Sequence, residues 1–200
     1  IEVGSDTVFN TGRVYRTGAQ IMKGLGIYPD DTERVNEFAG AITSVTQEGF
    51  GSDQLTTFVF DHGRHSHTLH PIQDELHTPE TTDLVPAYSK NPALRMVLGK
   101  IESDTAKRVL ENGWPKSGVK VFVSEGRDVF DVLKRGGVPA EDILSIFLGV
   151  DDRVAAERRQ GESIFQGLTI GEIEQKIAER NRADQSRSHG TYGFRDGRDT

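Results

Sequence analysis

The heptapeptide GRVYRTG at residues 12–18 decides the fold that we expect. Val14 and Tyr15 both prefer strands, so the pattern predicts a strand over residues 12–16 that ends in Arg16. An arginine at the end of a strand lies at the rim of the sheet, and Gly18, just beyond it, lets other groups approach the backbone. A guanidinium in that place can hold a phosphate or diphosphate through two hydrogen bonds. The competing interpretation is a surface ion pair.

The composition is that of a globular protein, with 34% hydrophobic and 28% charged residues, and it excludes several classes of function. The net charge of −7 argues against a general nucleic-acid binder, which needs clustered Lys and Arg. The absence of cysteine rules out a cysteine nucleophile, a disulfide framework and a zinc–thiolate site. No apolar run approaches the ~20 residues that span a membrane.

The length of the chain favours a single catalytic-type domain, which we expect over residues 1–181. From Arg180 onward the sequence is polar, rich in Arg and nearly free of large apolar residues. Such a segment cannot bury enough surface to become ordered, so we predict a disordered tail over residues 182–200. The chain opens at Ile1 and not at Met, which indicates a piece of a longer protein.

Apolar spacing and turn residues predict the other elements. We expect helices capped at Thr32 and at Asn91, a helix begun by the Thr169–Glu172 capping box, and strands over residues 55–60, 84–89, 119–123 and 143–150. Residues 61–83 are expected to form a long polar loop. The helices do not alternate regularly with the strands, which predicts an α+β domain and not a doubly wound parallel sheet.

The polar loop carries most of the histidines of the chain, at positions 62, 65, 67, 70 and 77. Imidazoles can bind Zn²⁺ or act as bases. The loop lacks the H-E-x-x-H pattern of a catalytic zinc site, so a solvated or substrate-facing loop is the main interpretation and a metal or base role is the alternative.

Three acidic residues, Glu125, Asp128 and Asp131, follow the clearest strand of the sequence. In one interpretation they belong to a helix over residues 125–135, with Asp128 and Asp131 on its solvent face and Glu125 near its positive end. In the other, one of these carboxylates points into a cleft opposite Arg16.

Three features, in this order, resemble bacterial mono-ADP-ribosyltransferases of the toxin and type III effector kind. The first is an early strand that ends in Arg, here Val14-Tyr15-Arg16-Thr17. The second is an aromatic residue followed by Ser in the middle of the chain, here Ala87-Tyr88-Ser89. The third is a late carboxylate before a Gly-Gly turn, here Asp131 before Gly136-Gly137-Val138-Pro139. The resemblance spans roughly residues 12–150. The chain lacks the Glu-x-Glu pair and the Ser-Thr-Ser motif of the toxins, and it looks closest to the effector branch that uses an Arg and an Asp.

This resemblance implies an NAD-dependent enzyme that moves ADP-ribose from NAD⁺ to a side chain of a target protein. Its catalytic residues would be Arg16 and a late carboxylate, Asp131 or Asp128, which stabilises the oxocarbenium-like transition state. The residues that would bind NAD⁺ are Arg16, Thr17, Gly18, Tyr88 and Ser89. No metal is implied, and a protein of this kind would be a secreted effector or toxin domain delivered into a target cell.

The fold implied is an α+β domain with a split, mostly antiparallel sheet and flanking helices. Two alternatives stay open beside it. One is a metal-dependent hydrolase or nuclease built on the His-rich loop, and the other is a non-catalytic protein-binding module of the same fold, which the missing motifs favour. We expect neither a nucleic acid nor a membrane as partner.

Overall fold

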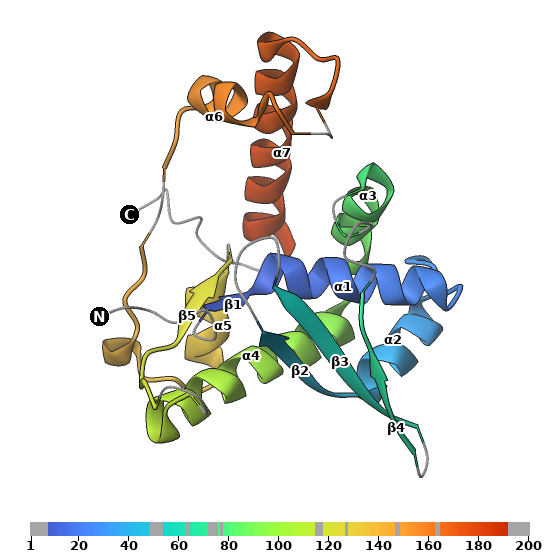
Figure 1. Cartoon of the computed structure of the whole chain (residues 1–200), viewed down its shortest axis with the longest axis vertical. Coiled ribbons are helices and arrows are strands. Elements are labelled where there is room, and N and C mark those ends of the chain that lie inside the picture. Colours follow the sequence, from blue (N-terminus) through green and yellow to red (C-terminus); the bar gives the residue numbers. More distant parts are fainter. Residues whose placement is uncertain are drawn as a thin grey trace. The chain divides into compact units, whose positions relative to one another are not determined.

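The computed structural model divides the chain into two compact units, Ile1–Ile143 and Leu144–Thr200, and each is described by itself. The residues that the structure describes are 8–48, 54–62, 65–71, 76, 78–114, 118–126, 128–146, 149–162 and 165–191. The helices and strands of both units are labelled in Figure 1.

The GRVYRTG stretch is helical, so the strand that we predicted over residues 12–16 is wrong. A short strand, β1 (Val8–Asn10), leads directly into helix α1 (Thr11–Gly24). Asn10 is the N-cap residue of α1, and its side chain accepts a hydrogen bond from the backbone N–H of Arg13. Val14, Thr17 and Ile21 are all buried on one face of the helix, which is a spacing of three and four. This helical periodicity outweighs the strand preference of two adjacent residues.

The first unit continues with elements that follow one another closely. They are α2 (Thr32–Ala41), β2 (Ile42–Glu48), β3 (Leu55–His62), β4 (His65–Leu69), α3 (Pro79–Tyr88), α4 (Pro92–Asn112), β5 (Val123–Glu125), α5 (Val129–Arg135) and the 3₁₀ turn η3 (Ala140–Asp142). Asn91 caps α4, as predicted, whereas the cap of α2 is Asp31 and not Thr32.

Two separate sheets form in this unit. Strands β2, β3 and β4 make an antiparallel sheet, while β1 pairs with β5 in parallel. We expected one split, mostly antiparallel sheet, and this prediction is wrong because β1 and β5 form a separate parallel pair. Parallel strands need a long crossover between them, and here the chain from α1 to α4 supplies it.

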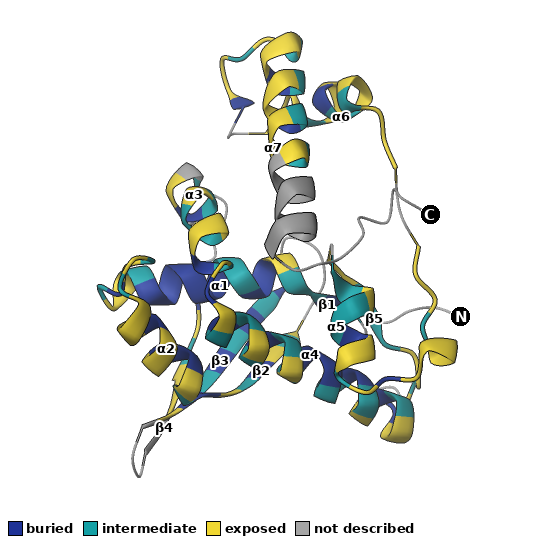
Figure 2. Ribbon diagram, turned by 180° about the vertical axis from the view of Figure 1, so that it is seen from behind, coloured by how far each residue is buried: buried dark blue, intermediate teal, exposed yellow. Residues whose placement is uncertain are grey.

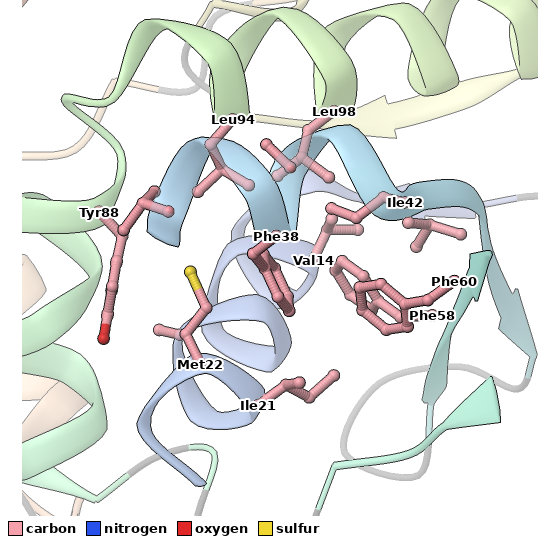
Figure 3. Packing of buried hydrophobic residues seen from close by; sticks show 14 of the residues in the cluster. Val14, Ile21, Met22, Phe38, Ile42, Phe58, Phe60, Tyr88, Leu94 and Leu98 are labelled. Atoms are coloured by element: carbon pink, nitrogen blue, oxygen red, sulfur yellow. The ribbon is translucent and has the colours of Figure 1, made fainter. Parts of the chain in front are cut away.

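The core of the first unit lies around α1. Figure 3 shows Val14, Ile21 and Met22 of this helix among the rings of Phe38, Phe58 and Phe60 and the side chains of Ile42, Tyr88, Leu94 and Leu98. Figure 2 shows that much of α1 is buried. Because α1 is fixed on several sides, its N-terminus is a rigid place for a functional site.

Three predicted segments have a different structure. The segment 84–89, expected to be extended, forms the end of α3, which carries Pro86 within it and ends at Tyr88, with Ser89 as its C-cap residue. The expected loop at 61–83 includes the strand β4 and the first turn of α3. Of the strand predicted over residues 119–123, only Val123 is paired, since β5 begins there.

The strand predicted over residues 143–150 does not form in the residues of this segment that the structure describes, 143–146 and 149–150. Leu144 and Ile146 are 85% and 72% exposed. Strand preference shows only that a segment suits a sheet, and a strand also needs a neighbour to pair with.

The second unit contains α6 (Asp152–Arg159) and α7 (Ile170–Thr191). Where the structure describes burial in this unit, a core cluster is formed by Ala156, Phe165, Ile173 and Ile177. The capping box is confirmed, because Glu172 accepts from the backbone N–H of Thr169 and donates its own N–H to the Thr169 hydroxyl. In the described part of the chain no helix has both the length and the apolar character required to cross a bilayer.

Helix α7 continues past residue 182, where the sequence predicted a disordered tail. The buried residues that the structure describes in the second unit all precede this position. We expect deletion of residues 182–200 to change the melting temperature by no more than about 2 °C, since the sequence of this segment holds few large apolar residues. Differential scanning calorimetry of the full and shortened chains measures this. A loss of several degrees contradicts the expected boundary at residue 181.

Candidate functional site

The parallel pair of strands, β1 and β5, suggests where in the first unit a ligand could bind. In parallel strands the carboxyl ends meet at the same edge, and in open sheets of this kind ligands bind there. The register pairs Phe9 with Ser124 and Asn10 with Glu125, so both strands end together. We call the residues around this edge the strand-end site: Asn10, Thr11, Gly12, Arg16, Glu102, Ser124, Glu125, Gly126 and Asp128.

Asn10 fixes the junction between β1 and α1. Its amide nitrogen Nδ2 donates to Glu125 Oε2 over 3.0 Å, which ties the ends of the two strands together. Its backbone is held by Gln47, whose side chain accepts from Asn10 N at 2.7 Å and donates to Asn10 O at 3.1 Å. The first N–H groups of a helix have no partner within the helix, and together with the helix dipole they favour an anion.

Arg16 lies beside this helix end. A Cβ placed on Gly12 would stand 3.5 Å from Nη1 of Arg16 and 3.4 Å from Oδ1 of Asn10. Side chains on a helix point toward its N-terminus, so a residue four positions later covers the preceding turn. The guanidinium of Arg16 is therefore next to the first turn of α1. The sequence predicted Arg16 as a phosphate ligand at a strand end, and the structure places it on a helix.

Gly126 brings the end of β5 against the start of α1. A Cβ on Gly126 would lie 2.8 Å from Cγ2 of Val129 and 3.2 Å from both Cβ and Oγ1 of Thr11. A larger residue here would have to displace the side chains of Val129 and Thr11.

Glu102 of α4 lies beneath the site, and it is only 2% exposed. Its Oε1 accepts hydrogen bonds from Thr11 Oγ1 at 3.0 Å and from Ser124 Oγ at 2.5 Å. The pKa of Glu102 is raised from 4.5 to about 7. Burial is the main cause and the charge of Asp128 adds a smaller rise, while the hydrogen bonds from Ser124 and Thr11 act in the opposite direction. The site thus contains a carboxyl group that gains or loses its proton near neutral pH.

Asp128, one of the two carboxylates proposed from the sequence, forms an ion pair with Arg95 of α4. The distance from Arg95 Nη2 to Asp128 Oδ2 is 2.8 Å, and both side chains are mostly buried, at 17% and 26% exposed. The interpretation that placed Asp128 on a solvent-facing helix surface is therefore wrong. Asp131 lies in the first turn of α5 and is partly buried.

The remaining residues predicted to bind NAD⁺ are not brought together at the strand-end site. Tyr88 is 1% exposed, and its hydroxyl donates to the carbonyl oxygen of Ile27 over 2.5 Å, so its ring belongs to the core. Thr17 and Gly18 are buried on the core face of α1, where a Cβ on Gly18 would lie 3.6 Å from the ring of Phe58. The hydroxyl of Ser89 caps its own helix by donating to the Pro86 carbonyl. A tyrosine held in this way cannot stack on a ligand.

One feature of the sequence marks Glu102 as a candidate site residue, although the residues after the strands did not lead to it. The buried stripe of α4 is Leu94, Leu98, Glu102, Ala106 and Val109, which is a spacing of four, four, four and three. A carboxyl group in a buried apolar stripe is costly unless it is hydrogen-bonded, so its presence marks a polar site.

The structure shows no metal centre among the histidines whose side chains it describes. In the residues that the structure describes, no three His, Cys, Asp or Glu side chains are grouped so as to hold a metal ion. His70 is exposed, and its Nδ1 is 3.1 Å from the hydroxyl of Thr57. The structure does not describe His77, nor the side chains of His62 and His65.

Comparison with known protein families finds a match to cytidylate kinase over residues 4–197 of the 200-residue chain. A comparison with curated proteins gives no significant match.

The family match overturns the resemblance to mono-ADP-ribosyltransferases and what it implied. We predicted the ADP-ribosyltransferase fold, NAD⁺ as a substrate and transfer of ADP-ribose to a target protein. All three predictions are wrong. The assignment as a secreted effector or toxin rested on the same resemblance and falls with it. The hydrolase or nuclease and the binding module are not supported either. The chain belongs to the cytidylate kinase family.

Proposed function

We propose that this chain takes part in phosphoryl transfer from ATP to a pyrimidine nucleoside monophosphate such as CMP. The family match over residues 4–197 carries the proposal. The strand-end site supports it, because a helix N-terminus and a guanidinium there can hold a phosphate group.

The strand-end site suits the acceptor nucleotide better than the donor. A P-loop, G-x-x-x-x-G-K-[ST], surrounds the donor phosphates with backbone N–H groups, and the 200 residues contain no such pattern. At the position where a strand leads into a helix, β1 ends at Asn10 and α1 starts at Thr11, without an intervening loop. We therefore assign this junction to the single phosphate of the acceptor.

In this assignment the residues act by position and charge, as is general in phosphoryl transfer. The first turn of α1 and Arg16 would hold the acceptor phosphate and offset its repulsion of the donor. Asn10 and Gly126 would keep the two strand ends in place. The chain has a net charge of −7, so an anion needs a local positive potential to bind. The N-terminus of α1 and the guanidinium of Arg16 would supply it.

Isothermal titration calorimetry with CMP, UMP, AMP and NAD⁺ tests the proposal at the level of binding. We expect CMP and UMP to bind more tightly than AMP, and NAD⁺ not to bind. A coupled assay for ADP formation from ATP and CMP tests turnover separately, since turnover also requires a donor site. Equal affinity for all four ligands, or no binding of CMP, contradicts the proposal.

A further inference from the structure

We propose that Glu102 is a positioning residue of the strand-end site. Glu102 joins the two strand ends through Thr11 and Ser124, and its charge state sets how tightly the site holds a nucleotide phosphate. The inference rests on the proposed function of the site.

Glu102 connects three elements through one oxygen atom. Thr11 is the first residue of α1, Ser124 lies in β5, and Glu102 itself is on α4. Both hydroxyls are within hydrogen-bond distance of Glu102 Oε1, and they are 3.5 Å from each other. Since the carboxyl group is buried, its hydrogen bonds are shielded from water and hold the two hydroxyls in fixed positions.

Ser124 makes this arrangement sensitive to the proton on Glu102. Its hydroxyl has one hydrogen but two possible acceptors, Glu102 Oε1 at 2.5 Å and the carbonyl oxygen of Phe9 at 3.2 Å. When Glu102 is ionised, Ser124 donates to it. When Glu102 is protonated, the carboxyl group can donate to Ser124, and the hydrogen of Ser124 is then available for Phe9 in the neighbouring strand.

The charged groups around Glu102 come from several elements. Asp128, which precedes α5, raises its pKa, and Asp128 is itself paired with Arg95, seven residues before Glu102 on α4. Glu125 of β5 is hydrogen-bonded to Asn10, and Nη1 of Arg16 of α1 lies near Gly12 in the first turn of the helix. Because Asp128 is paired with Arg95, an ionised Glu102 adds a buried negative charge that no cation in these contacts neutralises.

The negative charge of ionised Glu102 repels a bound phosphate. The carboxylate lies 3.0 Å from the hydroxyl of Thr11, the first residue of α1, and the phosphate would bind at this end of the helix. Two like charges in a partly buried site repel each other, so the ionised form should bind a nucleotide phosphate more weakly than the neutral form. Binding should in turn favour the protonated form and take up a proton, because the coupling is reciprocal.

The test compares wild-type protein with Glu102→Gln, which is neutral at every pH and keeps the shape of the side chain. CMP affinity is measured by calorimetry between pH 5.5 and pH 8.5. We expect the two proteins to bind equally near pH 5.5, and Glu102→Gln to bind about tenfold more tightly at pH 8.5. Calorimetry at pH 7 in buffers of different ionisation enthalpy should show greater proton uptake by the wild type. The comparison cancels the titration of the CMP phosphate itself, which is the same in both proteins.

Glu111→Gln is the matched control, since Glu111 is exposed near the end of the same helix. It should keep the wild-type pH profile. Ser124→Ala gives a second test that does not depend on Glu102→Gln folding. It removes a hydrogen bond that lowers the pKa of Glu102, so the pH at which affinity falls should move upward.

Superimposable pH profiles of the wild type and Glu102→Gln overturn the inference and leave the proposed function intact. An equal loss of affinity at every pH does the same, because it shows a purely structural role for Glu102. Absence of CMP binding in all variants overturns both.

Discussion

Replacing Arg16 by alanine is expected to weaken CMP binding by about ten- to a hundredfold. The guanidinium lies beside the first turn of α1, where a Cβ on Gly12 would be 3.5 Å from its Nη1 atom. A hydrogen bond between charged groups contributes about 1.5–3 kcal/mol, which corresponds to this range of affinity. Calorimetric titration with CMP measures the loss, and thermal unfolding of the same variant shows whether the fold is kept.

Two further variants make the Arg16 result specific. Arg16→Lys keeps the charge but not the planar pair of donors, so it should recover only part of the lost affinity. Arg108→Ala removes an exposed arginine from α4 and should change CMP affinity by less than about twofold. If Arg16→Ala binds CMP as tightly as the wild type, Arg16 does not hold the phosphate and our assignment of the acceptor site is wrong.

The sequence predicted well those elements whose signal is local. Asn91 followed by Pro92 marks the start of α4, and Thr169 with Glu172 marks the start of α7. In each case one or two side chains satisfy backbone groups within the same turn, so the nearest neighbours in sequence are sufficient.

The parallel pair could not be predicted in this way. β1 is three residues long and lies just before the strand predicted over residues 12–16. Its partner β5 is more than a hundred residues later, and the register of Phe9 with Ser124 depends on the intervening chain. Such pairing is set by long-range packing and not by local preference.

The candidate site shows which side-chain properties can be inferred without the fold. The prediction that Arg16 holds a phosphate rests on the chemistry of the guanidinium, which is the same on a helix as on a strand, and it stays a prediction. Tyr88 was assigned to a ligand from a short motif, but its burial and its bond to Ile27 depend on tertiary packing. Glu102 was missed because we looked for carboxylates after strands and not within an apolar helix face.

Glu102→Gln is expected to stabilise the folded protein at pH 8 by up to about 3 kcal/mol relative to the wild type. The pKa of Glu102 is about 7 in the folded protein, against an ordinary value of 4.5. Each unit of difference corresponds to about 1.4 kcal/mol between the two protonation states. Glutamine has no proton to lose, so the cost of ionising a buried carboxyl group disappears.

The direction of this pH dependence follows from proton binding. Between pH 4.5 and pH 7 the folded state keeps a proton on Glu102 that the unfolded state releases, so its stability falls as the pH rises. The contribution is complete below pH 4.5, and it is lost as the pH rises through about 7. Urea unfolding at pH 4 and pH 8 should therefore show the two proteins nearly equal in stability at pH 4 and clearly different at pH 8. A difference in unfolding free energy that does not vary with pH means that Glu102 is not protonated in the folded protein near neutral pH.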